Sequence, residues 1–514
     1  MTTLDMTIVN VALPKITTSL SAPLDEVTWV INAYLLIYAA LSIPSGRLGD
    51  IIGQRTIFVT GLCLFTVASA LCGLSQNVFL LVGARLLQGI GSAFITATSL
   101  ALLTSVVPPE RRGTAMGIYA SMAALASVVG PIVGGGIVSS VGWEWIFFVN
   151  VPIGILLFIG ALAGIPNVKI ERKHRFDIVG IVLSTLGLFG IIFSLVEGPT
   201  VHWGSVAGFL SVPEILIVSV ILLVAFVFWE RYQQEPFLPL GFFKNWTFSS
   251  MSLVNTILAF AHFGIVFLLT LYFESALGMS AFAAGLSILP EMLAILIVSP
   301  LAGRLSDKIG GKYVLIGGLL CFALGIGLFS LLSSTTANAF TFIAPLIIAG
   351  VGVGCSVGTV MGEAMRGVER AMLGTASGVI STSRLVGGSI GVAVITSFLQ
   401  SQLFSATNSQ LPATLQQVAS NQQSAFTSYL NALAQNEPVA HASLSTTLQH
   451  LAYQLYTSSF ILALRPTLGL VAILLVVGAL LASTVKTRKK AVSAAAQPAK
   501  DSSVEVSSTP QTAS

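Results

Sequence analysis

Long apolar runs recur along the whole of this 514-residue chain, and each has the length that a helix needs to cross a lipid bilayer. A transmembrane helix takes about 20 apolar residues. Such runs occupy residues 27–45, 57–75, 78–107, 114–140, 146–165, 178–196, 208–229, 249–273, 284–302, 313–333, 340–361, 376–398 and 458–484. With a mean hydropathy of +0.91 and only 9% charged residues, most of the chain is solvated by lipid rather than by water.

A fourteenth run at the very start is weaker than the others. Residues 4–13 are apolar apart from Asp5, Thr7 and Asn10, and ten residues in a helix cover roughly half of the hydrocarbon layer. Either the chain begins late, inside a helix whose first turns are missing, or its amino end is held in a wet cavity. We prefer the first reading, because a free amino group at mid-bilayer depth is costly.

The positions of the basic residues predict how the spans are oriented. If the loop at residues 46–55 faces the cytoplasm, nearly all of the 24 basic residues fall in cytoplasmic loops or in the tail. One missed span would invert every later loop, so this asymmetry supports fourteen spans with both termini cytoplasmic. We expect a multi-pass protein of the plasma (inner) membrane.

Three short sequences occur twice in the same order. "GRLGDIIGQR" at 46–55 matches "GRLSDKIGGK" at 303–312, "GIGSA" at 89–93 matches "GVGCS" at 350–354, and "RGTAMGIYAS" at 112–121 matches "LGTASGVIST" at 373–382. Nearly constant offsets indicate two homologous halves that run parallel to each other. Folds of this kind place the substrate site between the halves, near the bilayer midplane.

The repeats predict an all-α polytopic membrane protein with a six-plus-two-plus-six arrangement of spans. Its parts are a first six-helix bundle at 1–166, two linking transmembrane helices at 167–248, a second six-helix bundle at 249–484, and a disordered cytoplasmic tail at 485–514. The segment 400–457, rich in Gln, Ser, Ala and Asn, is predicted to form short amphipathic helices over the exterior mouth.

The repeated decapeptide combines glycines with charges at a loop between spans. Gly46 and Gly53 permit a tight turn and close helix approach. Asp50 can accept hydrogen bonds from the free amides of the helix that follows, and it can pair with Arg55 or Arg112. We expect a latch that forms when the two halves touch and breaks when they part, with Asp307 in the second copy. The alternative is that the basic residues only set topology, which leaves both aspartates unexplained.

Charged residues inside the spans are the candidates for function, because each is costly unless paired or hydrated. Asp5, Arg85 and Glu291 are the principal ones. Burial favours the protonated form of a carboxyl group and a nearby arginine favours its ionised form, so movement of Arg85 relative to Asp5 could switch proton binding. Asp5 could instead cap or bridge neighbouring helices. Glu291 is either a second proton site, the partner of a cationic substrate, or a structural residue. The weaker candidates are Asn10, Gln88, His262 and Arg384.

The decapeptide resembles the loop motif of the major facilitator superfamily, although Ile51 and Gln54 stand where that family usually has basic residues. "LDMTIVNVALP" at 4–14, "RLLQGIGSA" at 85–93 and "GPIVGG" at 130–135 resemble signatures of its fourteen-span drug:proton antiporters, the EmrB/QacA type. "WEWIFFVNVPIG" at 143–154 is similar to another, with Glu144 in place of the usual arginine. The resemblance implies an exporter, with Gly130, Pro131, Gly134 and Gly135 as its antiporter motif, and it places Asp5 and Arg85 in the central cavity.

These observations predict a proton-coupled exporter of hydrophobic or cationic compounds that works by alternating access. Transport would be driven by the proton gradient and would need no cofactor. The protein would work in the lipid bilayer and have no nucleic-acid partner. It could act as a monomer or together with an accessory envelope protein. "GCSVG" at 354–358 lies in a span without the setting of a catalytic serine, so no enzyme is expected. The alternatives are an exporter of one lipid or metabolite, and a non-transporting sensor or scaffold.

Overall fold

The computed structural model describes residues 1–165, 177–198, 201, 203–206, 210–233, 236–238, 240–366, 368–416, 418–420, 422–435 and 444–485. Regular structure in these residues is helical, apart from one isolated bridge between Ser205 and Ser211. The tail from residue 486 onward, which was expected to be disordered, and the basic loop at 166–176 lie outside the described residues.

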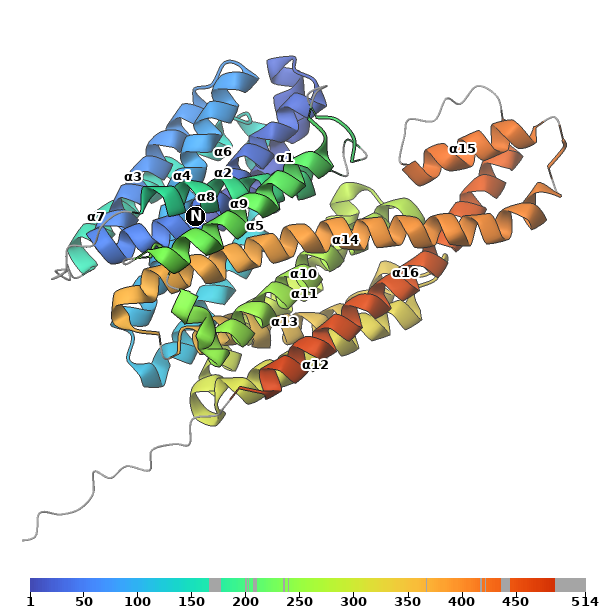
Figure 1. The fold of residues 1–514 in the computed structure, drawn as a ribbon. Helices are drawn as coiled ribbons and strands as arrows, with labels where there is room; N and C mark the ends of the chain where they lie inside the picture. Colours follow the sequence, from blue (N-terminus) through green and yellow to red (C-terminus); the bar gives the residue numbers. More distant parts are fainter. Residues whose placement is uncertain are drawn as a thin grey trace, which may run out of the picture.

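The helices follow the order predicted from the apolar runs (Figure 1). The first half contains α1 (Thr2–Leu20), α2 (Leu24–Ile52), α3 (Gln54–Gly73), α4 (Val78–Val106), α5 (Arg112–Ser140), α6 (Trp145–Phe148) and α7 (Asn150–Gly164). Two further helices are α8 (Ile178–Glu197) and α9 (Val212–Tyr232). The second half contains α10 (Trp246–Leu271), α11 (Ala281–Ile309), α12 (Gly311–Leu332), α13 (Ile343–Ala364), α14 (Leu373–Leu415), α15 (Gln423–Gln435) and α16 (Thr446–Ser483).

Among the described residues, 13 helical stretches are long and apolar enough to cross a membrane, and they coincide with the runs read from the sequence. Helix α1 is additional to these, because its polar residues lower its hydropathy. It has 19 residues and so a length of about 28 Å, which is longer than the ten-residue apolar stretch suggested. Its buried face, Asp5, Ile8, Val9, Ala12 and Ile16, packs mainly on α5.

Side-chain caps fix the start of many helices, because the first amides of a helix have no partner within it. Each capping side chain accepts a hydrogen bond from an amide in the first turn: Asn77 of α4, Asp177 of α8, Ser211 of α9, Asn245 of α10, Ser280 of α11 and Ser445 of α16. At the motif end of each half, by which we mean the end that carries residues 46–55 or 303–312, a glycine makes the turn instead. Gly53 and Gly310 have φ angles of 120° and 98°, which favour glycine.

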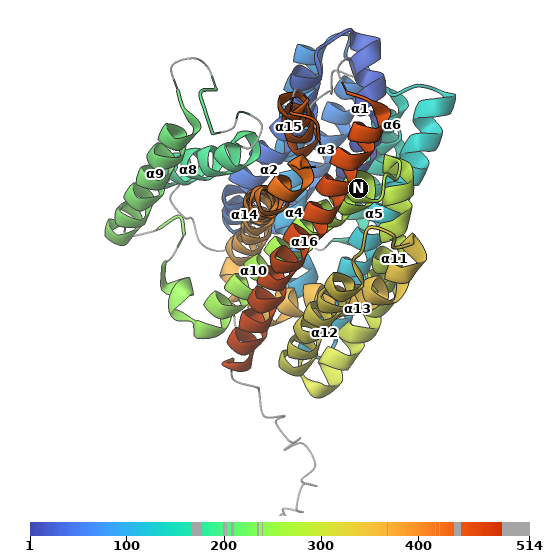
Figure 2. The same ribbon diagram turned by 90° about the vertical axis from the view of Figure 1, so that its right-hand side faces the viewer.

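Helices α8 and α9 pack on each other and stand at one side of the molecule (Figure 2). Helix α8 lies on α2, where the rings of Trp29 and Phe193 are 5.8 Å apart and the Asn32 amide donates to Glu197 at 2.9 Å. It also contacts α14 of the second half. Helix α8 therefore covers the seam between α2 and α14, and α9 packs on α8.

The segment 400–457 differs from the expected set of separate short helices. Helix α14 continues without a break to Leu415, α16 already begins at Thr446, and only α15 is a separate short helix (Figure 1). The extensions hold together because Phe426 and Leu430 of α15 are buried and the Ser458 hydroxyl donates to Gln410 at 3.0 Å.

Candidate functional site

The structure brings Asp5 and Arg85 into direct contact in the first half. Both side chains are buried, and the Arg85 guanidinium donates to the Asp5 carboxylate from Nη1. Arg85 also donates to the Gln88 Oε1 atom at 2.7 Å and to the carbonyl of Val30 at 2.8 Å. The guanidinium carbon lies 4.1 Å from the centre of the Tyr34 ring, which gives the cation a further favourable contact.

Two amide side chains complete the shell around Asp5. Gln88 donates to Asp5 Oδ1 at 2.9 Å, and Asn150 donates to the same oxygen at 3.1 Å. Asn150 is bonded in turn to the Ser69 hydroxyl at 3.2 Å. Asn150 was not among the residues predicted from the sequence; the available signal was a lone amide in the apolar stretch at 145–154.

The antiporter motif shapes the neighbourhood of this pair. Gly130 and Gly134 lie against Thr7 and Ile8 of α1, so closely that an added Cβ atom would overlap either side chain. Gly135 leaves more room, because an added Cβ atom there would lie 3.9 Å from its nearest neighbour, the Val11 side chain. Pro131 is exposed on the outer face of α5. The two inward glycines thus let α1, which carries Asp5, approach α5.

A central cavity of about 350 Å³ lies between the two halves. Four helices of each half line it: α1, α2, α4 and α5 from the first, and α10, α11, α13 and α14 from the second. Its described wall is largely apolar and aromatic, and it includes Asn10. The charged or titratable groups on the wall, tyrosines apart, are Arg85, His262 and Arg384.

Glu291 lies behind this wall instead of on it. It is fully buried on α11, and its carboxylate Oε1 atom is 3.4 Å from the Nδ1 atom of His262 on α10. Neither carboxylate oxygen has a hydrogen-bond partner among the described residues. The sequence places no basic residue within a helical turn of Glu291, but packing of α10 supplies an imidazole that separates it from the cavity.

The motif end joins the two halves by a pair of matching contacts. Asp50 of α2 accepts hydrogen bonds from the amides of Gly374 and Thr375 at 2.8 and 2.7 Å, at the start of α14. Asp307 of α11 does the same with Gly113 and Thr114 at 2.7 and 2.8 Å, at the start of α5. Each aspartate thus binds the free amides that begin a helix of the opposite half.

The prediction that Asp50 pairs with Arg55 or Arg112 was therefore wrong. Arg55 donates to the carbonyl of Leu162 at 2.5 Å, and Arg112 donates to the carbonyl of Val107 at 3.3 Å. Gln54, which replaces a basic residue of the family motif, donates to Asp50 at 2.7 Å. The amides come from the opposite half and not from the helix that follows Asp50, because the helix starts of both halves converge here.

Close glycine contacts accompany these bonds. An added Cβ atom at Gly46 would overlap the carbonyl of Gly374, and one at Gly303 would overlap the carbonyl of Gly113. Both repeated sequences therefore meet: the decapeptide of one half packs on the Gly-Thr pair of the other.

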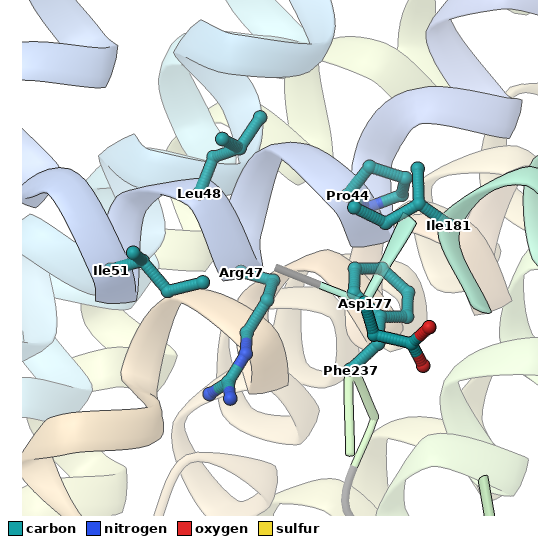
Figure 3. Close-up of a pocket in the computed structure, with 7 residues that line it drawn as sticks. All are labelled: Pro44, Arg47, Leu48, Ile51, Asp177, Ile181 and Phe237. Carbon is teal, nitrogen blue, oxygen red and sulfur yellow. The ribbon is translucent and has the colours of Figure 1, made fainter. Parts of the chain in front are cut away.

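Arg47 of the decapeptide has a separate role. It is buried, and its Nη2 atom donates to the carbonyl of Pro236 at 3.3 Å, in the segment after α9. Its side chain lies with Ile51, Asp177 and Phe237 around a small pocket where α2 meets the extra helices (Figure 3).

Comparison with known proteins decides the family. Residues 1–392 match the family model described as Major Facilitator Superfamily. The chain belongs to the Major Facilitator Superfamily. As a member, it is a multi-pass membrane transporter of small molecules, not an enzyme.

Its relatives within the superfamily include exporters and resistance proteins. The multidrug resistance protein Stp of Mycobacterium tuberculosis is 33% identical over 401 residues, which cover 78% of this chain and 74% of the relative. The methylenomycin A resistance protein of Bacillus subtilis is 33% identical over 399 residues, covering 77% and 84%. The tetracenomycin C resistance and export protein of Streptomyces glaucescens is 32% identical over 398 residues, covering 77% and 73%.

Solved structures of the superfamily share the fold. The human organic anion transporter MFSD10 (TETRAN) superposes with a TM-score of 0.57 at 13% identity, covering 90% of this chain and 96% of that one. The proton:xylose symporter XylE has a TM-score of 0.53 at 14% identity, covering 90% and 91%.

Proposed function

We propose that this transporter is a proton-coupled exporter of hydrophobic compounds, of the fourteen-span drug antiporter type, and that it works by alternating access of the central cavity. The observation that carries the proposal is the buried Asp5 carboxylate, held by Arg85 directly behind the wall of a cavity that both halves share. Relatives named as multidrug resistance and antibiotic export proteins support transport out of the cell.

In the proposed mechanism, the relative movement of the two halves is coupled to proton binding at Asp5. In the arrangement described, Arg85 compensates the negative charge of Asp5, so that the carboxylate can remain ionised in a dry environment. A relative movement of α1 and α4 that separates the pair would leave an uncompensated buried charge, and protonation removes that cost. Proton binding at Asp5 would thus accompany the opposite conformation, in which the contacts at Asp50 and Asp307 are broken.

Glu291 and His262 form the second proton site of the proposal. The imidazole faces the cavity on one side and the buried carboxylate on the other, so it can pass a proton between them. The two Glu291 carboxylate oxygens have no hydrogen-bond partner among the described residues, so the imidazole is the proton donor available to this buried group.

Cationic compounds, which the sequence also allowed as substrates, have less support. A cation in this cavity would meet Arg85, His262 and Arg384, while both carboxylates stand behind these groups. The proposal is therefore restricted to hydrophobic compounds that carry no positive charge.

The experiment is a panel of toxic compounds tested on cells that express the protein, with neutral, acidic and cationic members of similar apolar size. We expect resistance to neutral hydrophobic compounds, loss of resistance with a protonophore, and loss with Asp5→Asn at equal membrane abundance. Resistance that survives both treatments would contradict proton coupling, and no resistance to any member would contradict export.

A further inference from the structure

Arg384 stands apart from the other basic groups of the cavity wall. Arg85 is bonded to Asp5 and Gln88, and His262 faces Glu291. In the described part of the chain, no hydrogen-bond acceptor or carboxylate pairs with the guanidinium of Arg384. Its recorded contact is the ring of Phe263, whose centre is 5.8 Å from the guanidinium carbon.

This unpaired charge lies at membrane depth on α14, where a cation is costly unless it is paired or hydrated. The cavity that it lines is the place from which a partner can come. Because a guanidinium presents a planar fork of donors, it binds a carboxylate through two parallel hydrogen bonds. A carboxylate-bearing ligand would therefore complete the coordination that the chain itself leaves open.

Tyrosine hydroxyl groups of the first half lie near the Arg384 guanidinium. Tyr38 of α2 and Tyr119 of α5 line the cavity and lie within electrostatic range of Arg384. The neighbouring Tyr34 is engaged, since its hydroxyl is bonded to Ser92 at 2.6 Å. Tyr38 is also engaged, because its hydroxyl is hydrogen-bonded to Thr96. The Tyr119 hydroxyl lies 3.5 Å from the Ser99 hydroxyl, and either group can be the donor. When Ser99 donates, the Tyr119 proton can go to an anion that Arg384 holds, and that anion would connect the two halves.

The remaining wall suits an apolar body attached to that anion. Leu100, Ile295, Val353 and Val357 line the cavity together with the ring of Phe263. A volume of about 350 Å³ lies within the range of sites that enclose a small organic molecule.

From these contacts we propose that Arg384 is the anion-binding residue of the transport cavity, and that the protein prefers amphipathic carboxylates, either aromatic acids or fatty acids, over neutral and cationic compounds of the same shape. The inference rests on the proposed export function and names its substrate class. The competing structural role is a guanidinium that is merely hydrated, in which case removing its charge would leave ligand preference unchanged.

The test measures binding to the purified full-length protein in lipid nanodiscs, without a proton gradient. The probes share one apolar body: pyrenebutyrate, its neutral methyl ester and the corresponding trimethylammonium compound. The fatty acid cis-parinarate and its methyl ester form a second matched pair, which distinguishes an acyl source of the carboxylate from an aromatic one. The variants are Arg384→Gln, Arg384→Lys, and Arg465→Gln as a matched control, because Arg465 of α16 donates to the carbonyl of Ser333 and does not line the cavity.

We expect at least one of the two acids to bind about tenfold or more tightly than its own methyl ester, as a charge-assisted hydrogen-bond pair predicts. Arg384→Gln should abolish this preference for the acid. Its ester binding should stay unchanged, which would show that the variant is folded. Arg384→Lys should keep much of the preference, and Arg465→Gln should keep all of it. Equal binding of acid and ester by the unmodified protein, or an intact preference in Arg384→Gln, would overturn the proposal. Either result would leave export of neutral compounds standing, so the two proposals fail separately.

Discussion

The hydroxyl of Thr375 in the second half donates to the carboxylate of Asp50 in the first half at 2.6 Å, and Thr114 donates to Asp307 at the same distance in the mirrored direction. All four residues belong to the repeated sequences at 46–55, 112–121, 303–312 and 373–382. The two bonds can exist only while the halves touch at the motif end. They therefore stabilise one of the two conformations that alternating access requires.

Replacing Asp50 and Asp307 by asparagine should weaken this closed conformation. Each replacement turns an amide group toward backbone donors, and each donor left without a partner costs about 1–3 kcal/mol. We expect either single variant to populate the open motif end more than the unmodified protein, and the double variant to do so most. The measurement is the distance between spin labels on the motif ends of α2 and α14, in a background without the four cysteines.

Arg55→Gln is the matched control, because the Arg55 guanidinium bonds to Leu162 and not to Asp50. Its label distances should match those of the unmodified protein. An unchanged distance distribution in the double aspartate variant would show that the contacts do not hold the motif end closed.

Gly303→Ala should block the same closure by steric overlap. The added Cβ atom would overlap the carbonyl of Gly113 and lie 3.0 Å from the Cα atom of Thr114. Overpacking of this kind costs about 1–3 kcal/mol, and a cost of about 1.4 kcal/mol already lowers the ratio of closed to open molecules about tenfold. Transport should fall by a similar factor while membrane insertion stays normal.

The control for that variant is Gly327→Ala on α12, where nothing lies within 4 Å of the added atom. Both substitutions gain the same helix propensity, so the comparison isolates the contact between the halves. Equal transport by the two variants would argue against a close approach at Gly303 during the cycle.

The Asp5 and Arg85 pair should show strong coupling in stability. Removing one partner of a buried ion pair costs about 3–5 kcal/mol, because the other charge is left uncompensated. Asp5→Asn should therefore lower the melting temperature more than the double variant Asp5→Asn, Arg85→Gln does. Thermal unfolding in detergent, followed with a thiol-reactive dye, measures the difference. Additive losses in the double variant would mean that the two groups do not compensate each other.

His262 and Glu291 should act in one proton-transfer step. Glu291→Gln and His262→Asn should each reduce substrate-induced proton movement in membrane vesicles, and the double variant should lose no more than the stronger single one. His450→Gln, at an exposed position of α16, should behave like the unmodified protein. Full proton movement in both single variants would exclude this pair from coupling.

The apolar runs and the internal repeats were enough to predict the helical membrane fold and the number of strongly apolar spans. They also identified Asp5 and Arg85 as candidates, since a charge in an apolar run is evident from sequence alone. The partners of these charges were harder to predict. Asn150 reaches Asp5 from a helix distant in the chain, and His262 reaches Glu291 from the preceding long helix; only the packing of those helices reveals the contacts.

The partners of Asp50 show the same limit more clearly. Charge pairing suggested arginines, but the donors are uncharged: the backbone amides of Gly374 and Thr375, the Thr375 hydroxyl and the Gln54 side chain. The repeated Gly-Thr pairs at 113–114 and 374–375 were the available clue, because a repeat that is shared by both halves points to a shared contact.

The proton coupling of export is the central claim, and inside-out membrane vesicles test it most directly. The vesicles are given an acidic interior, the neutral dye Nile red is added outside, and proton loss from the interior is followed with a pH-sensitive fluorophore. The account predicts that the dye accelerates proton loss with the unmodified protein and not with Asp5→Asn at equal abundance. Dye accumulation without proton movement, or an undiminished signal in Asp5→Asn, would contradict it.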